Sequence, residues 1–213
     1  MDKEPQAAPV PLCVDLDGTL IRTDLGVESF FRELRRAPLA AAALLIRAPF
    51  QGGRPWLKRR LAKGASLAPE SLPYEEDVLS WCREEAGTGR LLVLATGSDE
   101  IYAEQVARHL GIFREALGSD GRVNLVGRAK ANALVGRFGR GGFDYVGDAR
   151  ADLPVWGACR RAIAAGGGAR LLLRKRLPQA AIERVFERRG GPPSTFIAAV
   201  IRGFRDTGAW RRD

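Results

Sequence analysis

Three short apolar runs, each followed directly by small polar residues, constrain the fold of this chain more than any other feature. The runs span residues 11–16, 91–95 and 143–146. The residues that come after them are Asp17-Gly18-Thr19, Thr96-Gly97-Ser98 and Gly147-Asp148. Runs of this length, bounded by turn-forming residues, are typical of strands that are buried on both faces. The sequence therefore predicts three buried strands that end in polar turns.

Helical periodicity follows two of these strands. Apolar residues recur at i, i+3, i+4 and i+7 over residues 103–110 and 131–138, and a glycine follows each stretch. Strands that alternate with helices predict an α/β fold with a Rossmann-like, doubly wound parallel sheet. In such sheets the ligand binds beyond the carboxyl ends of the strands. We therefore expect the three polar turns to form one site.

A helical insertion separates the first strand from the second. The expected catalytic core comprises residues 11–20 and 91–175, and residues 21–90 form a helical cap above the strand ends. Prolines and glycines divide this cap into short helices. Residues 176–213 are expected to form a C-terminal helical tail, because apolar residues between Phe196 and Phe204 have helical spacing.

An uncharged stretch, residues 37–46, lies within the expected cap. We favour the interpretation that it forms the cap's own apolar core, and a surface that faces a membrane is the alternative. With only ten residues it is too short to cross a bilayer, which needs about 20 apolar residues. The N-terminal residues lack the basic and apolar regions of a secretory signal. The sequence thus favours a cytoplasmic location, and a peripheral position at the inner face of a membrane stays open.

Histidine and cysteine chemistry is excluded as the basis of a catalytic site. The chain has one histidine, His109, which cannot supply a His-rich zinc site. Its three cysteines are odd in number and widely spaced, and none is followed six residues later by the arginine that a cysteine phosphatase needs. A hydrolytic mechanism in this chain must therefore use carboxylates.

Charge is distributed unevenly around an acidic middle. The chain carries a net charge of +9; residues 21–73 contribute +6, residues 160–213 contribute +9, and the remainder contributes −6. Such basic segments attract anionic partners, which include nucleic acid, anionic lipid and phosphorylated substrates. Nucleic acid is the least favoured of these partners, because no recognition helix, zinc knuckle or aromatic-basic motif accompanies the charge.

Carboxylates in the polar turns are the candidates for chemistry. Asp15 and Asp17 lie at the end of the first strand, and Asp148 and Asp152 follow the third. Thr96 and Gly97 follow the second strand, and Lys130 begins a later helix. Taken alone, Asp152 is better explained as a turn former or helix cap, and Lys130 as a solvated helix residue. Ser98 could bind phosphate but is better explained as the cap of the helix that contains Val106.

These residues suit the hydrolysis of a phosphate monoester. Mg²⁺ prefers carboxylate and carbonyl oxygens, which Asp15, the backbone carbonyl of Asp17, and Asp148 would supply. Asp15 would attack phosphorus to form an aspartyl-phosphate, and Asp17 would serve as general acid and then general base. Thr96 and Lys130 would hold the transferring phosphoryl group. Asp152 would support the site, through a metal-bound water or by orienting Lys130.

The order of these motifs resembles that of the haloacid dehalogenase (HAD) superfamily of aspartate-nucleophile phosphohydrolases. The resemblance covers about residues 11–165 and is carried by Asp15-Leu16-Asp17-Gly18-Thr19, Thr96, Lys130 and Gly147-Asp148 with Asp152. It implies catalysis by Asp15 and Asp17, phosphate binding by Thr96, Gly97 and Lys130, and Mg²⁺ binding by Asp15, Asp17 and Asp148. It also implies that the insertion is a helical cap.

A closer resemblance connects the chain with the HAD-like domains fused ahead of UbiA-type membrane prenyltransferases. The stretches 11–20, 94–96, 142–148 and 151–156 carry it. The expected function is therefore Mg²⁺-dependent hydrolysis of a small or lipid-linked phosphomonoester. Three alternatives remain: a phosphotransferase, a non-catalytic module associated with a membrane prenyltransferase, and a basic nucleic-acid binder.

Overall fold

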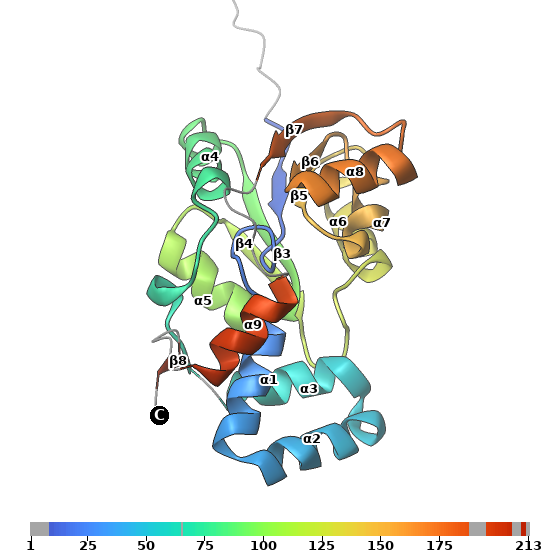
Figure 1. Cartoon of the computed structure of the whole chain (residues 1–213). Helices are drawn as coiled ribbons and strands as arrows, with labels where there is room; N and C mark the ends of the chain where they lie inside the picture. Colours follow the sequence, from blue (N-terminus) through green and yellow to red (C-terminus); the bar gives the residue numbers. More distant parts are fainter. Residues whose placement is uncertain (1–8, 65, 188–194, 206–209, 212–213) are drawn as a thin grey trace, which may run out of the picture.

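A six-stranded parallel sheet organises the fold in the computed structural model, which describes residues 9–64, 66–187, 195–205 and 210–211 (Figure 1). Its strands lie in the spatial order β4-β3-β1-β5-β6-β7. In chain order they are β1 (Leu12–Val14), β3 (Leu92–Asp99), β4 (Glu115–Ser119), β5 (Asp144–Gly147), β6 (Ala162–Ala165) and β7 (Ile182–Phe186). The expected Rossmann-like α/β fold is confirmed, with β1 between β3 and β5 at the centre of the sheet.

Helices connect the strands and extend below one end of the sheet. The α-helices are α1 (Leu25–Arg36), α2 (Pro38–Gln51), α3 (Gly53–Lys63), α4 (Glu76–Gly87), α5 (Glu100–Leu110), α6 (Arg128–Phe138), α7 (Leu153–Trp156), α8 (Gly167–Arg176) and α9 (Thr195–Phe204). Two 3-10 turns are η1 (Pro69–Ser71) and η2 (Arg150–Asp152), and β2 (Ser66–Leu67) pairs antiparallel with β8 (Trp210–Arg211). None of the described helices is long and apolar enough to cross a membrane.

The core consists of two apolar layers, one on each face of the sheet. Alternate residues of a strand point to opposite faces, so Leu12 and Val14 pack with α4 and α5, and Cys13 packs with α6, α7 and α8. The helices α5 and α6 bury the apolar faces that the sequence predicts, which include Val106 and Leu134.

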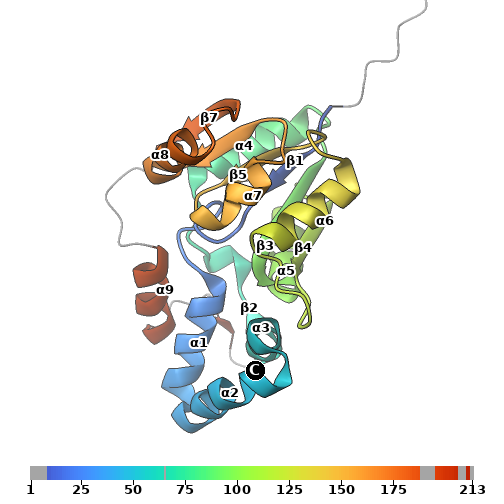
Figure 2. The ribbon, with the colours of Figure 1, turned by 90° about the vertical axis from the view of Figure 1, so that its right-hand side faces the viewer.

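The expected cap, residues 21–90, contains elements of two kinds. Helices α1, α2 and α3 lie together beyond the strand ends (Figure 2). Helix α4 differs from the expectation, because its buried residues Val78, Leu79, Trp81 and Cys82 join Leu92 in the core layer of the sheet. The extent of the cap as a separate unit therefore stays a prediction, and α4 covers the sheet instead.

Two expectations for the outer segments are wrong in part. The tail 176–213 is not wholly helical, because β7 extends the sheet at its edge. Of its described residues, which exclude 188–194, 206–209 and 212–213, those of α9 have the expected helical form, and α9 packs along α1 (Figure 1). The uncharged stretch 37–46 does not form a cap core. In α2 the small residues Ala41 and Ala48 face inward, whereas Leu39 is 87% exposed and Ile46 is 70% exposed.

Candidate active site

The carboxyl ends of β1, β3 and β5 surround a hollow of about 210 Å³. The sheet topology places β1 between the other two strands, so the polar residues after each strand meet at one edge. The hollow is lined by Asp15, Asp17, Asp24, Lys58, Gly97, Ser98, Val126, Lys130, Asp148, Ala149, Ala151 and Asp152. All but one of the predicted site residues therefore line this hollow, and the exception is Thr96.

Asp15 and Lys130 form a buried ion pair at the base of the hollow. The Nζ atom of Lys130 donates to Oδ1 of Asp15 at 2.7 Å, and only 4% of Lys130 is exposed. Burial raises the pKa of Asp15 well above its usual range; Lys130 opposes this rise, and the carboxylates of Asp152 and Asp148 add to it. Burial disfavours the ammonium of Lys130, but Asp15 and Asp152 outweigh it and raise that pKa. Lys130 thus favours the carboxylate form of Asp15 against the effect of burial, and Asp15 favours the ammonium form of Lys130.

Tyr145 and Asp152 fix the position of Lys130. Lys130 Nζ also donates to the Tyr145 hydroxyl at 2.9 Å, and this hydroxyl donates to Oδ1 of Asp152 at 2.7 Å. The second oxygen of Asp152 accepts from the backbone N–H groups of Asp148 and Ala149 at 3.2 and 3.1 Å. Asp152 thus orients Lys130 and shapes the loop after β5. Tyr145 is a site residue that sequence reasoning missed, because a tyrosine inside an apolar strand gives no motif.

Asp17 is held by donors from the core and from the start of α1. Its Oδ1 accepts from the backbone N–H of Leu25 at 2.8 Å, and its Oδ2 accepts from the Thr96 hydroxyl at 3.0 Å. Burial and then Asp24 raise the pKa of Asp17 to about 6, although hydrogen bonds from Leu25, Ser98 and Thr96 oppose the shift. In the structure, the Thr96 hydroxyl therefore donates its hydrogen bond to the carboxylate of Asp17.

The second strand continues further than its sequence predicts. Thr96, Gly97 and Ser98 were expected in a turn, but β3 runs to Asp99 with an irregular register after Ala95. Consequently Ser98 is not the cap of α5; Asp99 takes that place, and its side chain accepts from the N–H of Ile101. Ser98 lies beside Asp17 in the hollow instead.

Three carboxylates are close enough to share a cation. Oxygens of Asp15, Asp148 and Asp152 lie within 4.8 Å of one another, in a search of the described residues. Carboxylate oxygens are the ligands of hard divalent cations, so this donor set fits Mg²⁺. The Asp152 oxygens already accept hydrogen bonds from Tyr145 and the backbone. Asp15 accepts from Lys130, and the Thr19 hydroxyl lies 3.4 Å from an oxygen of Asp15 and from one of Asp148. The side chain of Asp17 lies outside this cluster.

Glycines permit the close approach of the acidic loops. Gly18 has a φ of +76°, and a Cβ atom there would lie 2.5 Å from a carboxylate oxygen of Asp148. A Cβ at Gly147 would lie 2.7 Å from the carboxylate of Asp152. Either substitution would push apart the loops after β1 and β5, so the geometry of the acidic cluster depends on both glycines.

Lys58, from α3, brings a second cation into the hollow. Its Nζ donates to the carbonyl of Gly97 at 2.6 Å and to Oδ1 of Asn124 at 2.8 Å. Burial lowers the pKa of Lys58, and the nearby Asp17 and Asp24 oppose this shift. Sequence reasoning missed both Lys58 and Asp24, since one lies among several basic residues and the other reads only as the N-cap of α1. Nothing in the sequence places α3 over the strand ends.

Comparison with known proteins agrees with this geometry. A profile of haloacid dehalogenase-like hydrolases matches residues 12–156, which is more than half of the chain. The chain belongs to this family. It is also 39% identical over 175 residues to the uncharacterized protein y4nM of Sinorhizobium fredii. That match covers 82% of this chain and 33% of the relative, so the chain spans about a third of the relative's length.

Solved structures share the fold of this HAD-like hydrolase at low sequence identity. A protein of unknown function from Bordetella pertussis superposes with a TM-score of 0.60 and 17% identity, over 85% of this chain and 99% of that one. A phospho-aspartyl intermediate analogue of phosphoserine phosphatase superposes with a TM-score of 0.54 and 16% identity, over 85% and 95% of the two chains. These likenesses establish a common fold.

Proposed function

We propose that this HAD-like hydrolase is an Mg²⁺-dependent phosphatase that acts on a phosphomonoester through an aspartyl-phosphate. One observation carries the proposal. The carboxylate of Asp15 lies at the end of the central strand, 2.7 Å from Lys130 and in one cluster with Asp148 and Asp152. A phosphate monoester resists attack because of its negative charge, and this arrangement combines a carboxylate nucleophile with groups that neutralise that charge.

Asp15 is the nucleophile in this mechanism. Its carboxylate attacks the phosphorus atom, the bond to the ester oxygen breaks, and the phosphoryl group becomes bonded to Asp15. Lys130 holds the attacking carboxylate in place and offers its ammonium to the phosphoryl oxygens. Bound Mg²⁺, held by Asp15, Asp148 and the backbone carbonyl of Asp17, would supply further positive charge for the phosphoryl oxygens.

Asp17 moves the proton in both steps. In its protonated form it donates to the leaving oxygen, and as a carboxylate it then accepts a proton from the water that attacks the aspartyl-phosphate. A pKa raised to about 6 lets Asp17 serve in both forms near neutral pH. The hydrogen bond from Thr96 and the N–H of Leu25 keep its carboxyl group aimed into the hollow.

Phosphate release from p-nitrophenyl phosphate tests the proposal. We expect hydrolysis that needs Mg²⁺, disappears after chelation, and is lost in Asp15→Asn. The isosteric change removes the nucleophile but keeps the volume of the side chain, so circular dichroism should show a folded variant. Absence of Mg²⁺-dependent release from this ester and from a panel of small phosphorylated metabolites would contradict the proposal. The panel also identifies the substrate class, which the motifs leave open.

A further inference from the structure

Helix α2 lies at the end of the molecule farthest from the sheet (Figures 1 and 2), and it carries large apolar side chains that are exposed. Leu39, Ile46 and Phe50 are 87%, 70% and 83% exposed. Their spacing of seven and four residues puts them on one side of the helix, opposite the side on which Ala41 and Ala48 are buried. This stripe (Leu39, Ile46 and Phe50) is therefore an outward face.

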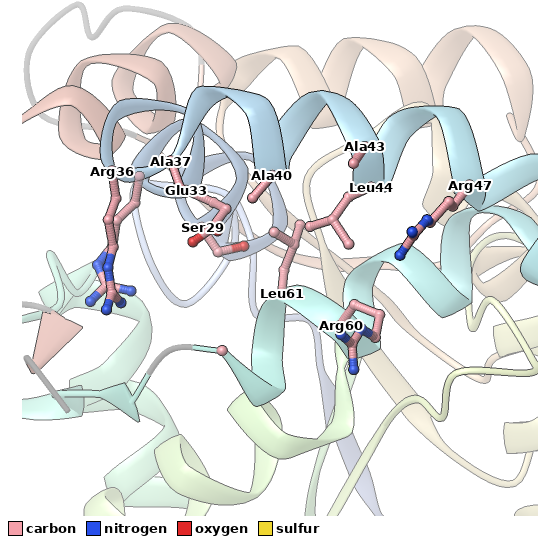
Figure 3. A pocket seen from close by; sticks show the side chains of 12 residues that line it. Ser29, Glu33, Arg36, Ala37, Ala40, Ala43, Leu44, Arg47, Arg60 and Leu61 are labelled. Carbon is pink, nitrogen blue, oxygen red and sulfur yellow. The ribbon is translucent and has the colours of Figure 1, made fainter.

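A basic pocket of about 500 Å³ lies beside the stripe, between α1, α2 and α3. Among the described residues that line it, four are arginines and Glu33 is the one acidic residue. Figure 3 shows Arg36 at one end of the pocket and Arg47 with Arg60 toward the other, with Leu44 between them. Within the described part of the chain, no ion pair joins Arg36, Arg47 or Arg60 to a carboxylate. These three guanidinium groups are available to an external anion.

We propose that α2 and the basic pocket form one surface that docks on an anionic phospholipid bilayer. The apolar stripe would enter the boundary between headgroups and acyl chains, with α2 parallel to the membrane plane. Arg47 and Arg60 would bind lipid phosphates in the pocket, because arginine donors match phosphate oxygens and the pocket carries an excess of positive charge.

A bilayer fits this surface through the combination of its two parts. The unpaired arginines require an anionic occupant, and the stripe requires an apolar one. On helical geometry the pocket residues Ala40 and Arg47 lie about a quarter turn from the stripe, so one occupant reaches both. An anionic lipid bilayer offers both parts of this surface a partner, because its phosphates lie directly beside its hydrocarbon. The proposal does not rest on the phosphatase mechanism, because neither part of the surface includes an active-site residue.

Co-sedimentation of the full chain with vesicles tests the docking surface. The probes are vesicles of phosphatidylcholine alone and of phosphatidylcholine mixed with phosphatidylglycerol. We expect binding to the mixed vesicles only, with loss of binding as salt rises. The triple variant Leu39→Ser/Ile46→Ser/Phe50→Ser and the double variant Arg47→Gln/Arg60→Gln should each weaken binding about tenfold or more.

Helix α8 supplies matched controls on another part of the surface. Leu171 is 68% exposed, and Arg174 and Arg176 are exposed near the end of the same helix. Leu171→Ser removes one exposed apolar side chain, and Arg174→Gln/Arg176→Gln removes two guanidinium groups, as the pocket variant does. Both should leave vesicle binding within about twofold of the original chain. Circular dichroism of every variant shows whether its fold is intact.

Three outcomes would overturn the proposal. The first is equal binding, or none, to neutral and anionic vesicles. The second is an equal loss of binding in the α2 and α8 variants, which would assign the attraction to net charge. The third is a dimer by light scattering that the triple variant abolishes, which would make the stripe an interface between copies. Phosphatase activity on a soluble ester is unaffected by each of these outcomes, so the two proposals fail separately.

Discussion

Charged side chains have opposite surroundings in the catalytic hollow and in the basic pocket of the cap helices. In the hollow, Lys130 is buried and has hydrogen bonds or ion pairs with Asp15, Tyr145 and Asp152. In the basic pocket between α1, α2 and α3, Arg47 and Arg60 are exposed and lack an ion pair with the described residues. A buried charge must be paired within the chain, because water does not solvate it. An exposed charge is solvated without a partner and remains able to bind an external one. The pairing of a charged side chain therefore distinguishes a residue that serves the catalytic site from one that can dock an external partner.

The substitution Lys130→Met should cause the largest losses of stability and turnover, because it disrupts the buried pairing in the hollow. It removes the cation that pairs with Asp15 and leaves buried carboxylates without compensation, which costs about 3–5 kcal/mol of unfolding free energy. Turnover should fall at least about 100-fold, since Lys130 positions the nucleophile. Urea unfolding and phosphate release measure the two losses. The control Lys175→Met removes an exposed cation of α8, and an equal loss in both variants would contradict the account.

The next largest expected effect is the change of the unfolding free energy with pH in the absence of metal. The pKa of Asp17 is raised to about 6 in the folded protein, from 3.8. Folding therefore takes up a proton between about pH 4 and pH 6, and the unfolding free energy falls as pH rises through this window. This single group accounts for about 3 kcal/mol on a scale of about 1.4 kcal/mol per pKa unit. Asp17→Asn should flatten the fall measured by urea unfolding in a chelating buffer.

The exposed Glu104→Gln on α5 is the control for that pH profile, because it removes a carboxylate far from the hollow. Its profile should follow that of the original chain. If Asp17→Asn retains the full decrease between pH 4 and pH 6, the raised pKa belongs to another group. Addition of Mg²⁺ should oppose the decrease at neutral pH, since a bound cation favours the ionised carboxylates.

Tyr145→Phe should have a smaller effect, because it removes one hydroxyl and keeps the packing of the ring. The change breaks the link between Lys130 and Asp152, and we expect a loss of about 1–2 kcal/mol in unfolding free energy with a several-fold lower kcat. Thermal unfolding and steady-state kinetics are the readouts. An unchanged stability together with an unchanged kcat would show that Asp152 positions Lys130 without Tyr145.

Lys58→Met should have the smallest effect and should act on binding. It removes the hydrogen bonds from α3 to Gly97 and Asn124, each worth about 1 kcal/mol. We expect about 1 kcal/mol of this to be lost from substrate binding, which corresponds to a rise in KM of about fivefold, with little change in kcat. Lys63→Met, at the exposed end of the same helix, is the control. A fall in kcat with constant KM would instead place Lys58 in the chemical step.

Sequence periodicity predicted the centre of the fold better than its edges. The strands β1, β3 and β5 and the helices α5 and α6 follow from apolar runs and helical spacing, because each is buried on one or both faces. The edge strand β7 carries Glu183 and Arg184 among its five residues, so it has no such pattern. The outward face of α2 was expected only as the alternative to a buried cap core, since an uncharged stretch suggests burial as readily as exposure.

The candidate site was predictable only where a motif marks its residues. Asp15, Asp17, Lys130, Asp148 and Asp152 come from loops after strands or from a helix start, and the structure brings them to one hollow. Tyr145 and Lys58 reach it through tertiary contacts, which depend on strand order and on the position of α3. The resemblance to domains fused with membrane prenyltransferases stays a prediction.

Transfer of the phosphoryl group to Asp15 is the central claim, and a trapping measurement tests it most directly. The Asp17→Asn variant lacks the general base for the second step, and the first step needs no general acid when the leaving group is p-nitrophenolate. It should therefore accumulate the aspartyl-phosphate when mixed with Mg²⁺ and p-nitrophenyl phosphate labelled at phosphorus. After acid quenching and proteolysis, the account predicts the label on the peptide that contains Asp15, and none in Asp15→Asn/Asp17→Asn. Label on another residue, or rapid turnover without any labelled peptide, would contradict it.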